Sequence, residues 1–160
     1  MFSITVIAVG KLKEKYYIQA VEEYVKRLSG LCKVQIIELP EHRLPENPSA
    51  AQIADGLARE GAAIREKLPR GAWFCVLTPE GKKLSSEAFA GALAEVKNSG
   101  RSAACFLLGS SFGIAPEVKG LADLRLSFSD MTFPHHLARV MLLEQLYRAE
   151  KINAGERYHK

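Results

Sequence analysis

The stretch Phe128-Ser129-Asp130-Met131-Thr132-Phe133-Pro134-His135-His136 leads directly into an apolar segment that ends near Ile152. Pro134 suits the first position of a helix, so a long helix is predicted to follow it. The mixed residues before it predict an irregular loop between a strand and that helix. Such a loop can present backbone N–H and C=O groups to an adenine edge, with Met131 and Phe133 as apolar walls. The alternative is that these side chains are ordinary core contacts.

Upstream of this stretch, apolar segments alternate with amphipathic ones. Strands are expected over residues 2–9, 32–39, 72–77, 103–108 and 124–128. Helices are expected over residues 14–28, 49–68, 85–98, 116–121 and from Pro134 to near 152. Ser49 and Gln52 have the spacing of a capping box, which marks the start of the second helix. The central strands are apolar without clean alternation, which predicts an α/β fold: a parallel, Rossmann-like sheet with helices on both faces.

Ligands of parallel α/β sheets bind where the strands end. Three such ends are rich in turn residues or irregular: an expected turn at 78–81, the glycine loop 109–113, and residues 129–134. Glycines in the middle loop allow the backbone to approach a ligand closely. The loop matches neither the dinucleotide fingerprint nor the Walker P-loop, so it does not indicate a nucleotide phosphate site. A tight turn without a ligand is the alternative.

Length and composition indicate a single domain over residues 1–160, with 48% hydrophobic and 25% charged residues. Cys32, Cys75 and Cys105 lie far apart in apolar runs, which is typical of buried thiols in a cytoplasmic protein. No run approaches the roughly 18 apolar residues of a membrane span, and the N-terminus lacks the charged start of a signal peptide. A net charge of +4 permits an RNA partner without establishing one.

The last helix is apolar around much of its circumference, which predicts burial on two sides and hence a subunit interface. Within it, Glu144 and Arg148 are spaced to form an ion pair. The adjacent His135 and His136 point about 100° apart on a helix, so they do not favour a metal site. The polar tail at 157–160 is either a frayed basic terminus or a group that stacks on a base, accepts its proton and holds phosphates.

Several segments together resemble one family, the small ribosomal large-subunit pseudouridine N3-methyltransferases of the SPOUT superfamily. The resemblance covers the whole chain. The segments that carry it are Ala8-Val9-Gly10-Lys11, Leu108-Gly109, residues 126–135, residues 139–149, and Tyr158-His159-Lys160.

This resemblance implies a C-terminal trefoil knot, a rare exception to unknotted topology, and a homodimer. The residues themselves already predict a cytoplasmic protein without a metal site. The resemblance also implies that S-adenosyl-L-methionine is the methyl donor and that the substrate is a pseudouridine in large-subunit (23S) rRNA, within assembled ribosomes. Tail residues of one subunit would complete the site of the other. By position, the donor is expected to contact Leu77, Gly109, Phe128, Ser129, Asp130, Met131, Thr132 and Phe133.

Further roles are hypotheses on the same resemblance. His159 is the expected base for the N3 proton, because imidazole titrates near neutral pH. Tyr158 would orient the nucleobase and Arg148 would stabilise negative charge on its carbonyls. The expected RNA contacts are Arg139, His135 and Lys160.

One departure from the family pattern is Ser110, which stands where the family usually has a second glycine after Gly109. The serine fits only if its φ is negative. A different hypothesis for the chain is a catalytically silent RNA- or ribosome-binding module on the same fold. Binding of S-adenosylmethionine discriminates between the two.

Overall fold

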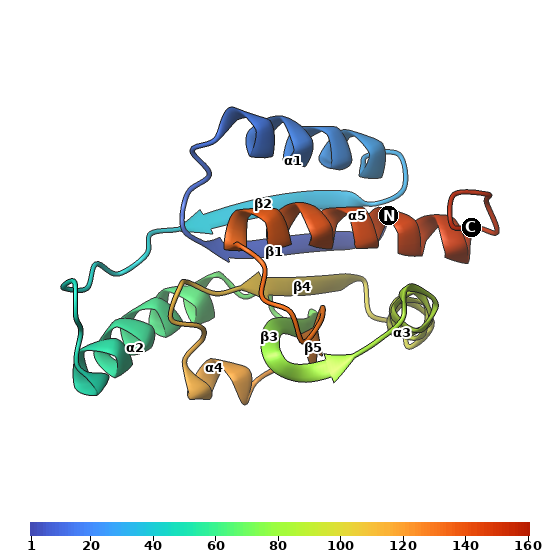
Figure 1. The fold of residues 1–160 in the computed structure, drawn as a ribbon. Coiled ribbons are helices and arrows are strands. Elements are labelled where there is room, and N and C mark those ends of the chain that lie inside the picture. Colours follow the sequence, from blue (N-terminus) through green and yellow to red (C-terminus); the bar gives the residue numbers. More distant parts are fainter.

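Five parallel strands form the sheet of the computed structural model, which describes residues 1–160 (Figure 1). Their bounds are β1 (Ser3–Val9), β2 (Lys33–Leu39), β3 (Trp73–Lys83), β4 (Ala103–Leu108) and β5 (Leu124–Ser127). Their order across the sheet is β2-β1-β4-β3-β5. The predicted parallel α/β fold is confirmed, and each predicted strand is present.

Each predicted helix is also present, within a few residues of its expected bounds. They are α1 (Lys15–Leu28), α2 (Ala50–Lys67), α3 (Ser86–Asn98), α4 (Pro116–Lys119) and α5 (His135–Asn153). The capping box is formed: Ser49 Oγ accepts from the Gln52 N–H at 3.1 Å, and Gln52 Oε1 accepts from the Ser49 N–H at 2.9 Å. Local sequence therefore defines where α2 begins.

Helices cover both faces of the sheet, as Figure 1 shows. Helices α1, α3 and α5 pack with one face, and α2 and α4 pack with the other. Helix α5 contacts both α1 and α3 and buries Leu142, Leu143 and Leu146 completely. Packing within one chain thus accounts for much of the apolar circumference of α5. Its role at a subunit interface stays a prediction.

The predicted turn at 78–81 is wrong in form. Strand β3 does not end at Leu77 but continues to Lys83, and its pairing with β5 shifts register: both Leu77 and Lys82 pair with Leu126. Gly81 makes this possible, because a Cβ there would lie 2.7 Å from the Leu126 carbonyl carbon. The extra residues bulge from the strand and form the hook of β3 in Figure 1.

The three cysteines are buried and unpaired, as predicted. Burial raises the pKa of the Cys32 thiol to about 11 and that of Cys105 to about 12. No helix combines the length and apolar character that a membrane crossing requires. No group of three or more potential metal-ligating side chains is present.

Candidate cofactor and catalytic site

A cavity of about 490 Å³ opens at the carboxyl ends of the strands. Its walls come from the bulge of β3, the loop after β4 and the loop after β5, which are the three segments that the sequence singled out. The residues expected to hold a methyl donor all line it: Leu77, Gly109, Phe128, Ser129, Asp130, Met131, Thr132 and Phe133. His135, at the first turn of α5, lies at the same cavity. The structure therefore brings segments from three parts of the chain into one site.

The loop after β4 requires glycine at its first position. A Cβ on Gly109 would lie 2.5 Å from both the Gly113 carbonyl oxygen and Ile114 Cγ1. Gly113 has a φ of +96°, a conformation that side-chain-bearing residues rarely adopt. Ser110 does not have a positive φ, since every residue with positive φ in this structure is a glycine. The serine therefore fits the loop without backbone strain.

Ser110 also has a specific partner. Its Oγ donates to Glu60 Oε1 at 2.8 Å, and both side chains are buried. The other oxygen, Glu60 Oε2, accepts from the His42 N–H at 2.9 Å. On the exposed side, Glu41 Oε1 accepts from Ser111 Oγ at 3.0 Å. Two carboxylates thus hold the loop through hydrogen bonds, and the hydroxyl of Ser110 donates to one of them.

Sequence reasoning missed Glu60 and Glu41. The signal for Glu60 was present, because it lies near Ile64 on the face of α2 that turns toward the core. A carboxylate at such a position needs a partner. Glu41 lies in a polar loop and carries no comparable signal.

Charged residues line one side of the cavity. Lys119, on α4, donates to Glu80 Oε1 at 2.5 Å. This hydrogen bond, with a second from Thr78, lowers the pKa of Glu80 to about 2, so the carboxylate is ionised at neutral pH. A second ion pair joins Lys83 and Asp130. Lys119 could not have been predicted, because nothing in the sequence places the short α4 beside β3.

The lining fits S-adenosylmethionine. The volume lies in the range of about 300–1,000 Å³ that small-molecule sites occupy. Leu108, Ile114 and Phe128 provide apolar walls, and the charged pair of Glu80 and Lys119 lies at one side. Gly109 also belongs to the lining, where the tight packing against Gly113 and Ile114 fixes the shape of the loop.

The three expected catalytic residues gather elsewhere, at the far end of α5. Arg148 donates from Nη1 to His159 Nδ1 at 2.9 Å, and its guanidinium lies 4.9 Å from the Tyr158 ring centroid. Glu144, predicted only as a partner of Arg148, is the centre of this group. It accepts from Arg148 Nη2 at 2.6 Å and from the Tyr158 hydroxyl at 3.3 Å.

This tail cluster, formed by Glu144, Arg148, Tyr158 and His159, has a defined protonation pattern. Arg148 can only donate, so His159 Nδ1 is the acceptor and Nε2 carries the proton donated to Glu87 at 2.6 Å. Burial, reinforced by the Glu144 carboxylate, raises the pKa of Tyr158, so its phenol stays neutral. The hydrogen bond to Glu144 raises the pKa of Arg148, which stays cationic.

The tail cluster does not reach the cavity of its own chain. Ala138 is the last cavity residue along α5, and Arg148 lies ten residues later on the same helix. At about 1.5 Å per residue, the two positions are roughly 15 Å apart along the helix axis. The structure thus brings the expected catalytic residues together, and the expected cofactor residues together, but in two separate places.

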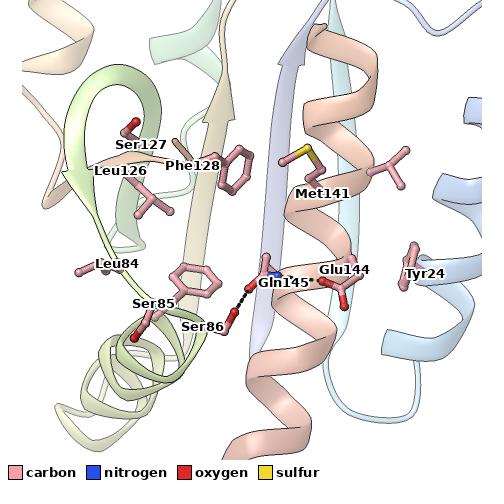
Figure 2. A pocket seen from close by; sticks show the side chains of 12 residues that line it. Tyr24, Leu84, Ser85, Ser86, Leu126, Ser127, Phe128, Met141, Glu144 and Gln145 are labelled. Atoms are coloured by element: carbon pink, nitrogen blue, oxygen red, sulfur yellow. Dashed lines mark hydrogen bonds between the residues drawn. The ribbon is translucent and has the colours of Figure 1, made fainter. Parts of the chain in front are cut away.

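A second cavity of about 350 Å³ lies between these two places (Figure 2). Leu126, Ser127 and Phe128 form a wall shared with the first cavity. On the opposite side, Ser86 Oγ donates to Gln145 at 2.7 Å, next to Glu144 of the tail cluster. Figure 2 shows the Phe128 ring facing Met141 across this space.

The expected RNA contacts differ in exposure. Lys160 and His135 are exposed. Arg139 is only 3% exposed; its Nη1 donates to Glu38 Oε2 at 2.6 Å and its Nη2 donates to the Gly10 carbonyl at 3.1 Å. Its guanidinium faces protein rather than solvent, so Arg139 is a structural residue in this chain and is not available to a phosphate.

Comparison with known proteins gives the family of the chain. A family described as "Predicted SPOUT methyltransferase" matches residues 2–159. The chain belongs to the SPOUT methyltransferase family. Membership makes it an enzyme of the methyltransferase class.

Relatives match over full length. A protein from Moorella thermoacetica is 45% identical over 160 residues, covering 100% of both chains. One from Clostridioides difficile is 46% identical over 158 residues, covering 99% of both. Each is named "Ribosomal RNA large subunit methyltransferase H". A probable methylase family protein from Haemophilus influenzae shares the fold, with a TM-score of 0.55 at 10% identity, over 99% of this chain and 70% of that one.

Proposed function

We propose that this protein methylates N3 of a pseudouridine in large-subunit (23S) rRNA, with S-adenosylmethionine as donor, on assembled ribosomes in the cytoplasm. The observation that carries the proposal is the convergence of Leu77, Gly109 and residues 128–133 on one cavity, in a chain that belongs to a methyltransferase family. The names of its full-length relatives support rRNA as the substrate class. The proposal includes the trefoil knot, which would enclose these loops.

The donor site is the cavity at the strand ends. When bound there, S-adenosylmethionine supplies an electrophilic methyl group. The Gly109 loop and residues 128–133 would hold it through backbone groups and apolar walls, and Phe128 would exclude water from one side.

The base would come from the tail cluster. The N3–H of pseudouridine is an imide proton that must leave before or during methylation. His159 Nδ1 carries the lone pair that accepts from Arg148. It would accept the N3 proton once Arg148 turns away from it. Glu87, which accepts from Nε2–H, would then stabilise the imidazolium. The released Arg148 would stabilise negative charge on the uracil carbonyls.

Tyr158 would position the nucleobase rather than accept its proton. Its raised pKa keeps the phenol protonated at neutral pH, so its ring and hydroxyl serve stacking and hydrogen bonding. Lys160 would contact a phosphate of the substrate, and His135 would contact RNA at the edge of the cavity.

The two groups of residues would meet only in a homodimer. Because about 15 Å of helix separates Arg148 from its own cavity, the tail of one subunit would serve the cavity of the other. Val140 and Met141 of α5, which line the second cavity and are only partly buried, are apolar and suit such an interface.

Mass mapping of rRNA from cells with and without the protein tests the proposal. One methyl group on a large-subunit pseudouridine should be present only in cells with the protein, and it should be lost in cells that carry His159→Ala. The competing function is a silent ribosome-binding module. That module would leave rRNA mass unchanged, and calorimetry would detect no binding of S-adenosylmethionine.

A further inference from the structure

An exposed basic segment connects β1 to α1 and has no role in the site described so far. Lys11, Lys13 and Lys15 are exposed, whereas Leu12 between them is buried. Tyr16 follows with 65% of its surface exposed, and its ring stacks at 4.6 Å, tilted, on Tyr17. Alternation of this kind turns the three ammonium groups and one aromatic ring outward from a segment held by a buried leucine.

This basic segment, residues 11–16, lies beside the cavity. Strand β1 pairs in parallel with β4, so the segment leaves the sheet at the same edge as the Gly109 loop. Glu14 Oε2 lies 3.0 Å from His136 Nδ1, and His136 follows His135, which lines the cavity. The Tyr17 ring also meets the His136 ring edge-on at 6.0 Å. Figure 1 shows the connection from β1 to α1 close to the first turn of α5.

The basic segment is held in place by Arg139. Besides its bond to the Gly10 carbonyl, Arg139 binds Glu38, and the same Glu38 oxygen accepts from the Leu12 N–H at 3.0 Å. The backbone before and within the segment is therefore tied to α5 and β2. A segment ordered before binding loses less conformational entropy when a ligand arrives.

The charge of the basic segment is available to a ligand. Neither Lys11, Lys13 nor Lys15 takes part in an ion pair, whereas the neighbouring carboxylates of Glu14 and Glu38 are already partnered, by His136 and Arg139. The segment itself carries three lysines and one glutamate, a net charge of 3 − 1 = +2. Unpaired ammonium groups next to an exposed aromatic ring match the phosphates and bases of unpaired RNA.

We propose that residues 11–16 form an RNA-docking surface, in which the three lysines contact phosphates flanking the target nucleotide and Tyr16 stacks on a neighbouring unpaired base. This inference rests on the proposed function, because the docked strand is taken to be the rRNA whose nucleotide enters the cavity. The surface gives each cavity its own basic approach, independent of the tail cluster that a second subunit would bring.

The test is binding of the full-length protein to ribosomes purified from cells that lack it, measured at several salt concentrations. A variant with Lys11, Lys13 and Lys15 each changed to Gln should lower the slope of log affinity against log salt by about 2 to 3, one for each lost phosphate contact. Tyr16→Ala should weaken binding about tenfold at every salt concentration, and Tyr16→Phe should bind within about twofold of the wild type, because the ring suffices for stacking.

Lys67→Gln is the matched control. Lys67 is exposed and unpaired, but it lies at the end of α2, on the other face and near the opposite edge of the sheet. It should leave the salt slope unchanged. All variants should bind S-adenosylhomocysteine as the wild type does, which shows that they are folded.

An unchanged salt slope in the triple variant would overturn the docking surface, whether or not the wild type methylates rRNA. A triple variant that loses affinity for polyglutamate but keeps its affinity for ribosomes would also overturn it, in favour of an acidic protein partner. Absence of the rRNA methyl group in wild-type cells would instead count against the proposed function. The two failures are therefore distinguishable.

Discussion

The cavity and the tail cluster differ in what a single chain can supply. The cavity is complete within one chain, and its loops are fixed by strand ends, by the glycines at 109 and 113, and by the carboxylate of Glu60. The tail cluster is also ordered, but its side chains are hydrogen-bonded to one another and to Glu87 of the same chain. The proposed donor site is therefore contained within one protomer, whereas the proposed chemistry requires two protomers.

The strongest test of this difference uses mixed dimers. His159→Ala should lower the methylation rate by roughly 10²–10⁴-fold, because it removes the proposed base, and Gly109→Val should block the donor site. When the two variants are mixed and exchange subunits, half of the dimers are mixed and each has one intact site. Activity should return to about a quarter of the wild type in an rRNA methylation assay.

If each tail served its own cavity, the mixture would stay as inactive as the two variants alone. A mixture of His159→Ala with His159→Ala plus Gly109→Val is the control, and no arrangement should restore its activity. The return of activity therefore depends on geometry rather than on mixing.

Arg139→Met tests whether the start of α5 belongs to the scaffold. Losing the partner of Glu38 should reduce the free energy of unfolding by about 2 kcal/mol, less than for a fully buried pair because the Glu38 side chain is 35% exposed. Urea unfolding measures this. A variant that unfolds at the same urea concentration as the wild type would show that Arg139 does not stabilise the scaffold.

The pH dependence of that stability has a defined sign. Burial acts to raise the pKa of Glu38, but hydrogen bonds from Arg139 and the Leu12 N–H outweigh it and lower the pKa below 4.5. The stabilisation is therefore present above about pH 4.5 and is lost as the pH falls through the lowered pKa. Arg139→Met should lack this part of the acid transition.

Gly109→Ala should weaken donor binding in the cavity and leave the tail cluster unchanged. The added methyl group would overlap Gly113 and Ile114 at 2.5 Å, and overpacking of this size costs about 2 kcal/mol. If the loop relieves this overlap by shifting and ligand binding must restore its shape, the whole cost falls on binding, and calorimetry should show S-adenosylhomocysteine bound roughly 30-fold more weakly. Gly91→Ala is the control: its Cβ would meet no atom within 4 Å in α3, and donor affinity should not change.

Ser110→Ala should give the smallest effect. It leaves a buried oxygen of Glu60 without its donor, which costs about 1 kcal/mol in thermal stability. Ser110→Thr should retain most of that stability, because it keeps the hydroxyl. Equal loss in both variants, measured by calorimetric unfolding, would show that space in the loop, not the hydrogen bond, determines stability there.

Much of the fold follows from local patterns. Ser49 and Ser85 mark helix starts through side-chain caps, and both caps are formed. The strands were predictable because they are short apolar runs between turn residues. The bulge of β3 was not, because it depends on a contact between Gly81 and the Leu126 backbone, which lies 45 residues away in the sequence.

The cavity was likewise predictable from strand ends, since parallel strands bring their carboxyl ends to one edge. The charged partners of the cavity loops could not be predicted from the sequence. Lys119 reaches Glu80, and Glu60 reaches Ser110, only through packing between elements far apart in the chain. The buried state of Arg139 depends in the same way on Glu38, a residue that periodicity assigns only to a strand.

The bonds from His159 to Glu87 and Arg148 have a consequence for how activity depends on dilution. A lone protomer carries its proposed base in a closed set of hydrogen bonds, so it is chemically idle even when the donor is bound. Under the proposed arrangement, working sites at high dilution increase with the square of the protomer concentration. Efficient methylation of ribosomes would then require the protein concentration in the cell to exceed a threshold.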